Sequence, residues 1–422
     1  MTDKKNMGKQ KGSSAHQPST YQPPQKLIDK YAQILVNFAL NSGEGVKPGE
    51  VVECIIPDVA KPMALALQNE VLKAKAHPMI RLLPTGFAQD YYTLAQDHQL
   101  EFFPQNYWQS KADLLTHRVQ ILADPHPNEL KNIDPSKIIR ARDARKPFKD
   151  WLTDKENKGQ FTWTIALWGV EAKANEVGLS LEDYWQEIFN AVYLNETDPV
   201  ARWKQIHRQQ EEIKQKLNSL PIQRVYIQGP DADLKVEIGL DRRWVGGSGR
   251  NIPSFEIFTS PNWRGTEGWM KFNEPVYRYG NVIKNVYLEF KNGLVTKAKA
   301  EQGNDILQEM IKSPNANKLG EVSMTDKRMS CITHPMAETL FDENMGGKYG
   351  NSHVAIGAAF RECYRKKDNE NTEDWTKEDW DKKGINDAAE HTDFVTTIDR
   401  TVTAELADGT KKIIYKNGQF VI

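Results

Sequence analysis

The chain has 422 residues, of which 39% are hydrophobic and 27% are charged, so it is long enough for two domains that each bury a core. This composition excludes a disordered or a fibrous protein. Its 56 lysines and arginines stand against 57 aspartates and glutamates, a formal charge of −1, which leaves no basic excess of the kind that drives binding to nucleic acid or anionic membranes.

The first residues and the cysteines indicate where the protein works. No run approaches the roughly 18 apolar residues of a membrane span, and the N-terminal residues contain no apolar signal-peptide stretch. The three cysteines, Cys54, Cys331 and Cys363, include no CxxC pair, which argues against a disulfide framework or a thiolate zinc site. We therefore expect a cytoplasmic protein with no membrane or nucleic-acid partner, whose cysteines are small core residues.

In the first half of the chain, residues 1–22 hold almost nothing to bury and are expected to form a flexible tail. Apolar residues at helical spacing between Leu27 and Phe38 then predict a helix. Residues 50–57 and 79–83 predict strands, with a helix at residues 63–76 between them. This alternation favours an α/β domain with a mainly parallel sheet. Because no glycine-rich phosphate loop is present, we do not expect a nucleotide site.

The middle of the chain is helical, with helices predicted at residues 181–194 and 200–217. Four tryptophans here are expected to anchor the core, with the wall of a substrate cleft as the alternative: Trp163, Trp168, Trp185 and Trp203. From Pro221 onward, strands predominate. The runs at residues 287–290 and 294–300 flank Asn292-Gly293, and two further hairpins are marked by Asp408-Gly409 and Asn417-Gly418.

These patterns divide the chain into two predicted domains. Residues 23–218 form an N-terminal α/β domain, and residues 219–422 form a C-terminal α+β domain rich in antiparallel strands. The boundary falls near residues 217–221, where a long helix ends and Pro221 starts the next strand.

Two clusters combine imidazoles and carboxylates. His391 and Asp393 are two residues apart, hence on the same side of an extended strand, where both can reach one cation. A capped loop or a hydrogen-bonded core pair is the alternative. Glu343 precedes a glycine-rich loop that can fold back and bring it to His353, although a solvated acidic turn has the same pattern.

Glu256 and Glu321 each stand among apolar or turn residues, where a carboxylate is costly to bury unless it is paired or binds metal. Surface or ion-pair positions are the alternative. Together with the two clusters they supply four carboxylates and two imidazoles within residues 256–393. This donor set suits two Zn²⁺, Co²⁺ or Mn²⁺ ions, which can activate water and polarise a carbonyl at neutral pH. Spacing alone does not establish that the six side chains converge.

In combination and order, a series of motifs covering nearly the whole chain beyond the tail resembles the thermophilic aminopeptidase family of metallopeptidases, typified by aminopeptidases T and S. The motifs are Asp198-Pro199-Val200 with Trp203, residues 249–253 (GRNIP) before Glu256, residues 258–261 (FTSP), 319–321 (LGE), 339–344 (TLFDEN), 353–357 (HVAIG) and 391–394 (HTDF), and the closing turns at 407–410 and 417–418.

The resemblance implies a two-metal exopeptidase that removes N-terminal residues from peptides with a free N-terminus. Carried over by motif, the metal ligands would be Glu256, Glu321, Glu343, His353, His391 and Asp393, with Glu321 as the bridge between the metals. It also implies a homodimer whose N-terminal domains help to enclose the catalytic cleft.

One departure concerns catalysis. The family commonly has a tyrosine, a candidate to stabilise the oxyanion, seven residues after the histidine of the 353–357 motif, and here that position is Phe360. Either the role is dispensable, or Tyr349 or Tyr364 takes it. Two alternatives therefore stay open: a catalytically silent family member that binds peptide or metal, and a two-metal hydrolase that acts on other amides. An N-acetylated peptide separates the latter from an aminopeptidase, which requires a free α-amine.

Overall fold

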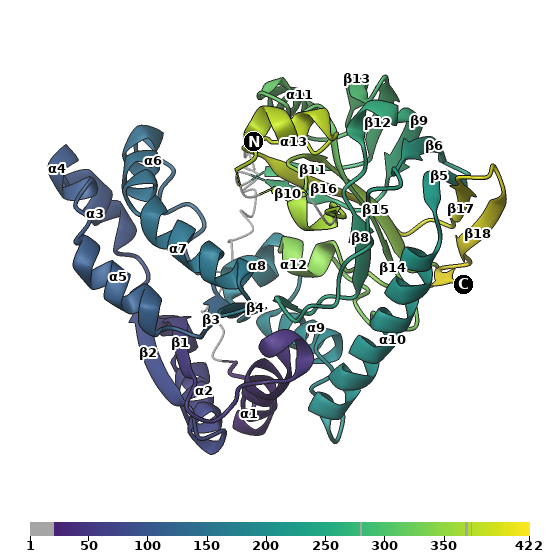
Figure 1. Ribbon diagram of the computed structural model, residues 1–422. Helices are drawn as coiled ribbons and strands as arrows, with labels where there is room; N and C mark the ends of the chain where they lie inside the picture. Colours follow the sequence, from purple (N-terminus) through teal and green to yellow (C-terminus); the bar gives the residue numbers. More distant parts are fainter. Residues whose placement is uncertain (1–20, 279–280, 368–369, 373) are drawn as a thin grey trace, which may run out of the picture.

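The computed structural model describes residues 21–278, 281–367, 370–372 and 374–422, so nearly all of the predicted tail lies outside it. Figure 1 shows two parts, one built on a parallel sheet with helices and one built on antiparallel sheets. The predicted fold class is therefore confirmed. In the described part of the chain, no helix has the length and apolar character needed to cross a membrane.

The first sheet has the strand order β2-β1-β3-β4-β7, and all its neighbouring strands are parallel. Its strands are β1 (Val51–Pro57), β2 (His77–Leu83), β3 (His117–Leu122), β4 (Thr162–Leu167) and β7 (Asn251–Ile252). The two predicted strands and the helix between them are confirmed, since α2 (Lys61–Lys73) connects β1 to β2. The strand β1 buries Val52, Cys54 and Ile56, which alternate along the strand and therefore share one covered face of the sheet.

The helices of this part surround the sheet and extend to one side of it (Figure 1). They are α1 (Gln25–Ile34), α3 (Ala88–Leu94), α4 (Asp97–Leu100), α5 (Gln105–Leu114), α6 (Pro135–Ala144), α7 (Lys146–Asn157), α8 (Glu171–Glu176), α9 (Leu181–Ala191) and α10 (Pro199–Ser219). The first predicted helix ends earlier than expected, at Ile34, because the next turn widens into a π-helix. The helix α9 ends at Ala191, because Tyr193 takes a positive φ and Leu194 bonds back to Phe189.

The second part holds an eight-stranded antiparallel sheet, ordered β13-β12-β9-β6-β5-β17-β18-β19, and a four-stranded antiparallel sheet, ordered β16-β15-β14-β8. The larger sheet consists of β5 (Ile222–Gly229), β6 (Ala232–Glu237), β9 (Glu267–Phe272), β12 (Val286–Lys291), β13 (Leu294–Lys299), β17 (Thr401–Leu406), β18 (Lys411–Lys416) and β19 (Gln419–Phe420). The three hairpins predicted from Asn-Gly and Asp-Gly are confirmed as β12–β13, β17–β18 and β18–β19.

The smaller sheet consists of β8 (Glu256–Thr259), β14 (Leu319–Thr325), β15 (Asn351–Gly357) and β16 (His391–Thr396). The second part also holds the hairpin β10 (Val276–Arg278) and β11 (Asn281–Ile283) and the helices α11 (Asn304–Lys312), α12 (Thr339–Asp342) and α13 (Lys377–Lys382). Every residue of β14 and β15 is buried, so this sheet lies inside the molecule.

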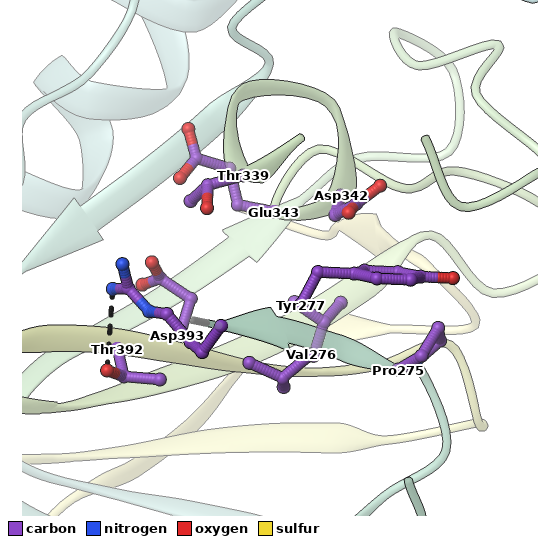
Figure 2. Close-up of a pocket in the computed structure, with 10 residues that line it drawn as sticks. Pro275, Val276, Tyr277, Thr339, Asp342, Glu343, Thr392 and Asp393 are labelled. Carbon is purple, nitrogen blue, oxygen red and sulfur yellow. Dashed lines mark hydrogen bonds between the residues drawn. The ribbon is translucent and has the colours of Figure 1, made fainter. Parts of the chain in front are cut away.

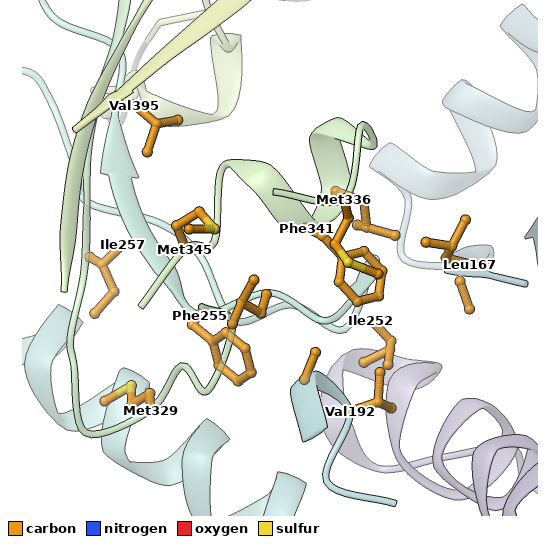
Figure 3. Close-up of a cluster of buried hydrophobic side chains, with 14 of the residues drawn as sticks. Leu167, Val192, Ile252, Phe255, Ile257, Met329, Met336, Phe341, Met345 and Val395 are labelled. Carbon is orange, nitrogen blue, oxygen red and sulfur yellow. The ribbon is translucent and has the colours of Figure 1, made fainter. Parts of the chain in front are cut away.

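The two parts share one apolar core. Figure 3 shows it passing from Leu167 of β4, through Phe255 and Phe341, to Val395 of β16. Of the four tryptophans, three are buried in this core as predicted, whereas Trp163 is only half-buried. The core expectation is wrong for one cysteine: Cys54 and Cys363 are buried, but Cys331 is exposed.

The parts are also joined by backbone and by charge. The strand β7 comes after the predicted domain boundary and yet pairs with β4 of the first sheet, so the segment before Glu256 is anchored there. Just before it, Arg250 pairs with Glu156 of α7 at 2.9 Å and with Glu362 at 2.9 Å. The boundary near residues 217–221 remains a prediction.

Candidate metal centre

Five of the six predicted ligands come from the four-stranded sheet, whose register brings them together. Glu256 begins β8, Glu321 and His353 lie on the central strands β14 and β15, and His391 and Asp393 lie on β16. Adjacent strands lie about 5 Å apart, and alternate residues point to one face. A side chain from each strand therefore reaches the same space.

The distances define a compact cluster. One ligand atom from each of Glu256, Glu321 and His353 lies within 4.8 Å of the others. The His353 Nε2 atom is 3.3 Å from Glu256 Oε2 and 3.2 Å from Glu321 Oε1. His391 Nε2 is 3.7 Å from Glu321 Oε2 and 3.3 Å from Asp393 Oδ1. Glu321 thus has one carboxylate oxygen beside each imidazole.

The sixth residue, Glu343, follows α12 directly and approaches the cluster from outside the sheet. It lines a cavity together with Asp393, as Figure 2 shows. The other side chains around this cavity come from β10, α12 and β16, and include Tyr277, Arg278 and Thr392. The structure therefore brings all six predicted ligands into one region.

The carboxylates at the middle of the site are crowded. Burial raises the pKa of Glu321 to about 7, and the charge of Glu256 contributes to this rise. A hydrogen bond with His353 acts in the opposite direction but does not outweigh them. Burial likewise raises the pKa of Glu343 well above its usual range, and the charges of Glu256 and Asp393 raise it further. Buried carboxylates that raise one another's pKa require protons or a cation among them.

The imidazoles supply positive charge to this cluster. Burial alone would lower the pKa of His353, but its hydrogen bonds with Glu256 and Glu321 raise it well above its usual range. Burial would also lower the pKa of His391, yet the charge of Asp393 raises it to about 9. Conversely, burial would raise the pKa of Asp393, but His391 lowers it to about 2. Metal binding would release these imidazole protons.

Hydrogen bonds outside the cluster fix the orientation of its rings. The Nδ1 atom of His391 is 2.8 Å from the carbonyl oxygen of Ala358, and the Nδ1 atom of His353 is 3.3 Å from Asn351 Oδ1. Each ring thereby turns its Nε2 atom to the carboxylates, as histidine metal ligands commonly do. The hydroxyl of Ser323 donates to Glu256 Oε2 at 3.2 Å. Sequence reasoning missed Asn351 and Ser323, which are ordinary polar residues of strands.

The residues present fit divalent metal ions. Four carboxylates and two imidazoles, buried or half-buried and gathered in one region, are the oxygen and nitrogen donors that Zn²⁺, Co²⁺ and Mn²⁺ accept. The raised pKa values of Glu321 and Glu343 indicate a surplus of buried negative charge, which two divalent cations would offset.

The contacts described for the two candidate tyrosines are with residues outside this cluster. The hydroxyl of Tyr364 donates to Glu370 Oε2 at 2.8 Å, and its ring packs on Trp375 and Trp380. Tyr349 lies beside β18, where its carbonyl oxygen accepts from the Tyr415 hydroxyl at 3.0 Å. A catalytic role for either tyrosine remains a prediction.

Phe360 lies beside the candidate metal centre. Its ring centroid is 5.0 Å from that of His391. The position at which the family described in the sequence analysis commonly has a tyrosine therefore lies beside a candidate ligand. Its ring is also 5.3 Å from Phe258, and 39% of the residue is exposed.

Comparison with known proteins gives concordant results. The family described as thermophilic metalloprotease (M29) matches residues 24–420. Aminopeptidase AmpS of Bacillus subtilis is 27% identical over 416 residues, covering 93% of this chain and 98% of that protein. Aminopeptidase T of Thermus thermophilus is 27% identical over 421 residues, covering 94% and 98%. The solved structure of wild-type AmpT from Thermus thermophilus aligns with a TM-score of 0.78 at 22% identity, covering 94% of this chain and all of that one.

Proposed function

The chain belongs to the thermophilic metalloprotease family M29, and from that premise we propose that it is an aminopeptidase that hydrolyses the N-terminal peptide bond of peptides at a two-metal centre. The relatives reported above, which it matches over nearly their whole length, are named aminopeptidases. The single observation that carries the proposal is the convergence of the six buried or half-buried donors from β8, β14, β15, β16 and the end of α12.

In this proposal the six side chains would hold Zn²⁺, Co²⁺ or Mn²⁺, and Glu321 would be the ligand shared by the two ions. When bound, two such ions supply Lewis acidity for the peptide carbonyl and lower the pKa of a water molecule. The bridging role is supported by geometry, since one Glu321 oxygen lies 3.2 Å from His353 and the other 3.7 Å from His391.

The chain's own groups would also bind the substrate's free end. Glu343 and Asp393 turn carboxylates to the cavity beside the cluster, where the protonated α-amine of a peptide would meet negative charge. A neutral acetylated N-terminus would lose this charge-assisted contact. This asymmetry supports an exopeptidase over a hydrolase of other amides.

Two further parts of the proposal concern assembly and location. We propose a homodimer in the cytoplasm. A dimer is supported by large apolar side chains that are exposed on the helical extension of the first part, where Leu94 is 79%, Phe102 72%, Phe87 67% and Tyr107 62% exposed. The cytoplasm is supported by the cysteines, which are all free.

The free-amine requirement is tested with matched peptides. We expect the metal-loaded protein to release the first residue of an unblocked peptide, and to cleave the same peptide with an N-acetyl group about 30–150-fold more slowly, because one lost charge-assisted contact is worth roughly 2–3 kcal/mol. Amino-acid analysis of the products measures both rates. Equal cleavage of both peptides would favour the hydrolase of other amides. No cleavage of either peptide by a folded, metal-loaded chain would favour a catalytically silent family member, the alternative suggested by Phe360.

A further inference from the structure

The strand that supplies His391 and Asp393 lies at an edge of its sheet. In the order β16-β15-β14-β8, β16 pairs on one side with β15, and among the described residues no strand pairs with its other side. An edge strand has a row of backbone groups without partners from its own sheet, and it is held less firmly than a central strand. Since β16 carries two of the six donors, something else must fix its outer side if the donors are to keep their geometry.

Contacts from the segment that ends in β10 meet that outer side. The backbone N–H of Glu274 donates to the Val395 carbonyl oxygen at 3.3 Å, whereas Arg278 meets the part of β16 that bears His391 and Asp393. Arg278, the last residue of β10, donates through Nη2 to the carbonyl oxygen of His391 and to the Thr392 hydroxyl, the latter at 3.4 Å. Both acceptors belong to the three-residue segment that bears the donors, and Figure 2 draws the bond to Thr392 as a dashed line. Thr392 is itself almost fully buried, so its hydroxyl has little access to water.

The charge of Arg278 matters as much as its hydrogen bonds. The residue lines the same cavity as Glu343 and Asp393, and it is the only lysine or arginine among the described residues around that cavity. Arg278 therefore contacts the backbone of one ligand pair and brings a positive charge to the cavity that Asp393 also lines.

We propose that Arg278 is a positioning residue for the β16 half of the metal centre, which holds His391 and Asp393 in place through the His391 carbonyl and the Thr392 hydroxyl. The inference rests on the proposed two-metal function. It makes Arg278 the residue that supports His391 and Asp393, which form one half of the site. The other half, Glu256 and His353, lies on strands that do not contact Arg278 in the described hydrogen bonds, and Ser323 and Asn351 support it. Loss of Arg278 should therefore affect the two metal sites unequally.

Calorimetric titration of the full-length apoprotein with Zn²⁺, and absorption spectra with Co²⁺, test the proposal. We expect Arg278→Met to weaken one of two metal sites by about 10–100-fold, the usual cost of removing an outer support, and to leave the other unchanged. Arg278→Lys should recover part of the metal affinity. Its ammonium group can still donate to the His391 carbonyl oxygen, although it lacks the planar arrangement of donors of a guanidinium. Arg224→Met is the matched control, since Arg224 pairs with Glu405 in the other sheet at 2.8 Å.

A second readout does not depend on metal. In the apoprotein, hydrogen exchange of the peptide covering residues 391–396 should be faster in Arg278→Met than in the wild type and in Arg224→Met. Unchanged exchange, or a folded Arg278→Met chain that loses both metal sites equally or neither, would overturn the proposal. A wild-type chain that binds fewer than two ions would instead contradict the proposed function, and the exchange measurement would still decide the role of Arg278.

Discussion

Replacement of Glu321 with glutamine is expected to abolish turnover, lowering kcat by at least about 10³-fold, while the chain stays folded. Glutamine keeps the volume of the side chain but removes the charge that faces both imidazoles, at 3.2 Å and 3.7 Å. Metal-assisted catalysis supplies several kcal/mol of transition-state stabilisation, and about 4 kcal/mol corresponds to this fold-change. The fold should tolerate the change, because a buried carboxylate with a pKa raised to about 7 is itself costly to the native state.

The measurement is kcat on an unblocked peptide at saturating metal, together with the thermal midpoint of the apoprotein. Glu405→Gln serves as the matched control, because Glu405 lies on β17 and pairs with Arg224 in the other sheet. We expect wild-type kcat from the control and a thermal midpoint for Glu321→Gln no lower than that of the wild type. Substantial remaining activity in Glu321→Gln would contradict the bridging role.

The second large effect concerns stability of the first part of the chain. Glu53 of β1 has a side chain only 2% exposed, and it pairs with Lys111 and with Arg118, the latter at 2.7 Å. Glu53→Gln would leave two cations without their partner in a largely buried place, which costs about 3–5 kcal/mol. Burial alone would raise the pKa of Glu53, but Arg118 and Lys111 outweigh burial and keep it below its ordinary value.

Urea unfolding at two pH values tests this assignment. Because the folded-state pKa of Glu53 is depressed, its stabilising contribution is fully present above the unfolded pKa and is lost as the pH falls through the folded pKa. The difference between wild type and Glu53→Gln should therefore be large at pH 7 and shrink below about pH 4.5. Glu44→Gln is the control, since the Glu44 side chain is 69% exposed and forms a surface ion pair with Lys47. A difference under about 1 kcal/mol at pH 7 would refute the assignment.

Local patterns account for what the sequence could predict. Alternating strands and helices indicated the parallel sheet, and Asn-Gly or Asp-Gly turns located three hairpins, because these signals act over a few residues. His391 and Asp393 share one side of β16 for the same reason, and they make a 3.3 Å contact. A hydrogen-bonded pair without a metal would make the same contact. The other four residues of the cluster are therefore what distinguishes a metal site from such a pair.

Long-range arrangement accounts for what the sequence could not predict. Asn251 and Ile252 form a strand only because they add to the edge of a sheet made by residues far earlier in the chain. The contacts of Arg278 to β16 span more than a hundred residues, and no spacing rule connects such positions. Asn351 orients His353 from only two residues away, yet an asparagine at the start of a strand carries no signal of that role.

The most direct test of a two-metal centre is the number of metal ions bound per folded chain, measured by equilibrium dialysis against Zn²⁺ or Co²⁺ with elemental analysis. We expect two ions per chain for the wild type, loss of peptide hydrolysis after EDTA treatment, and recovery when the metal is added back. One ion per chain, or full hydrolysis by a chain from which EDTA has removed all metal, would contradict this expectation.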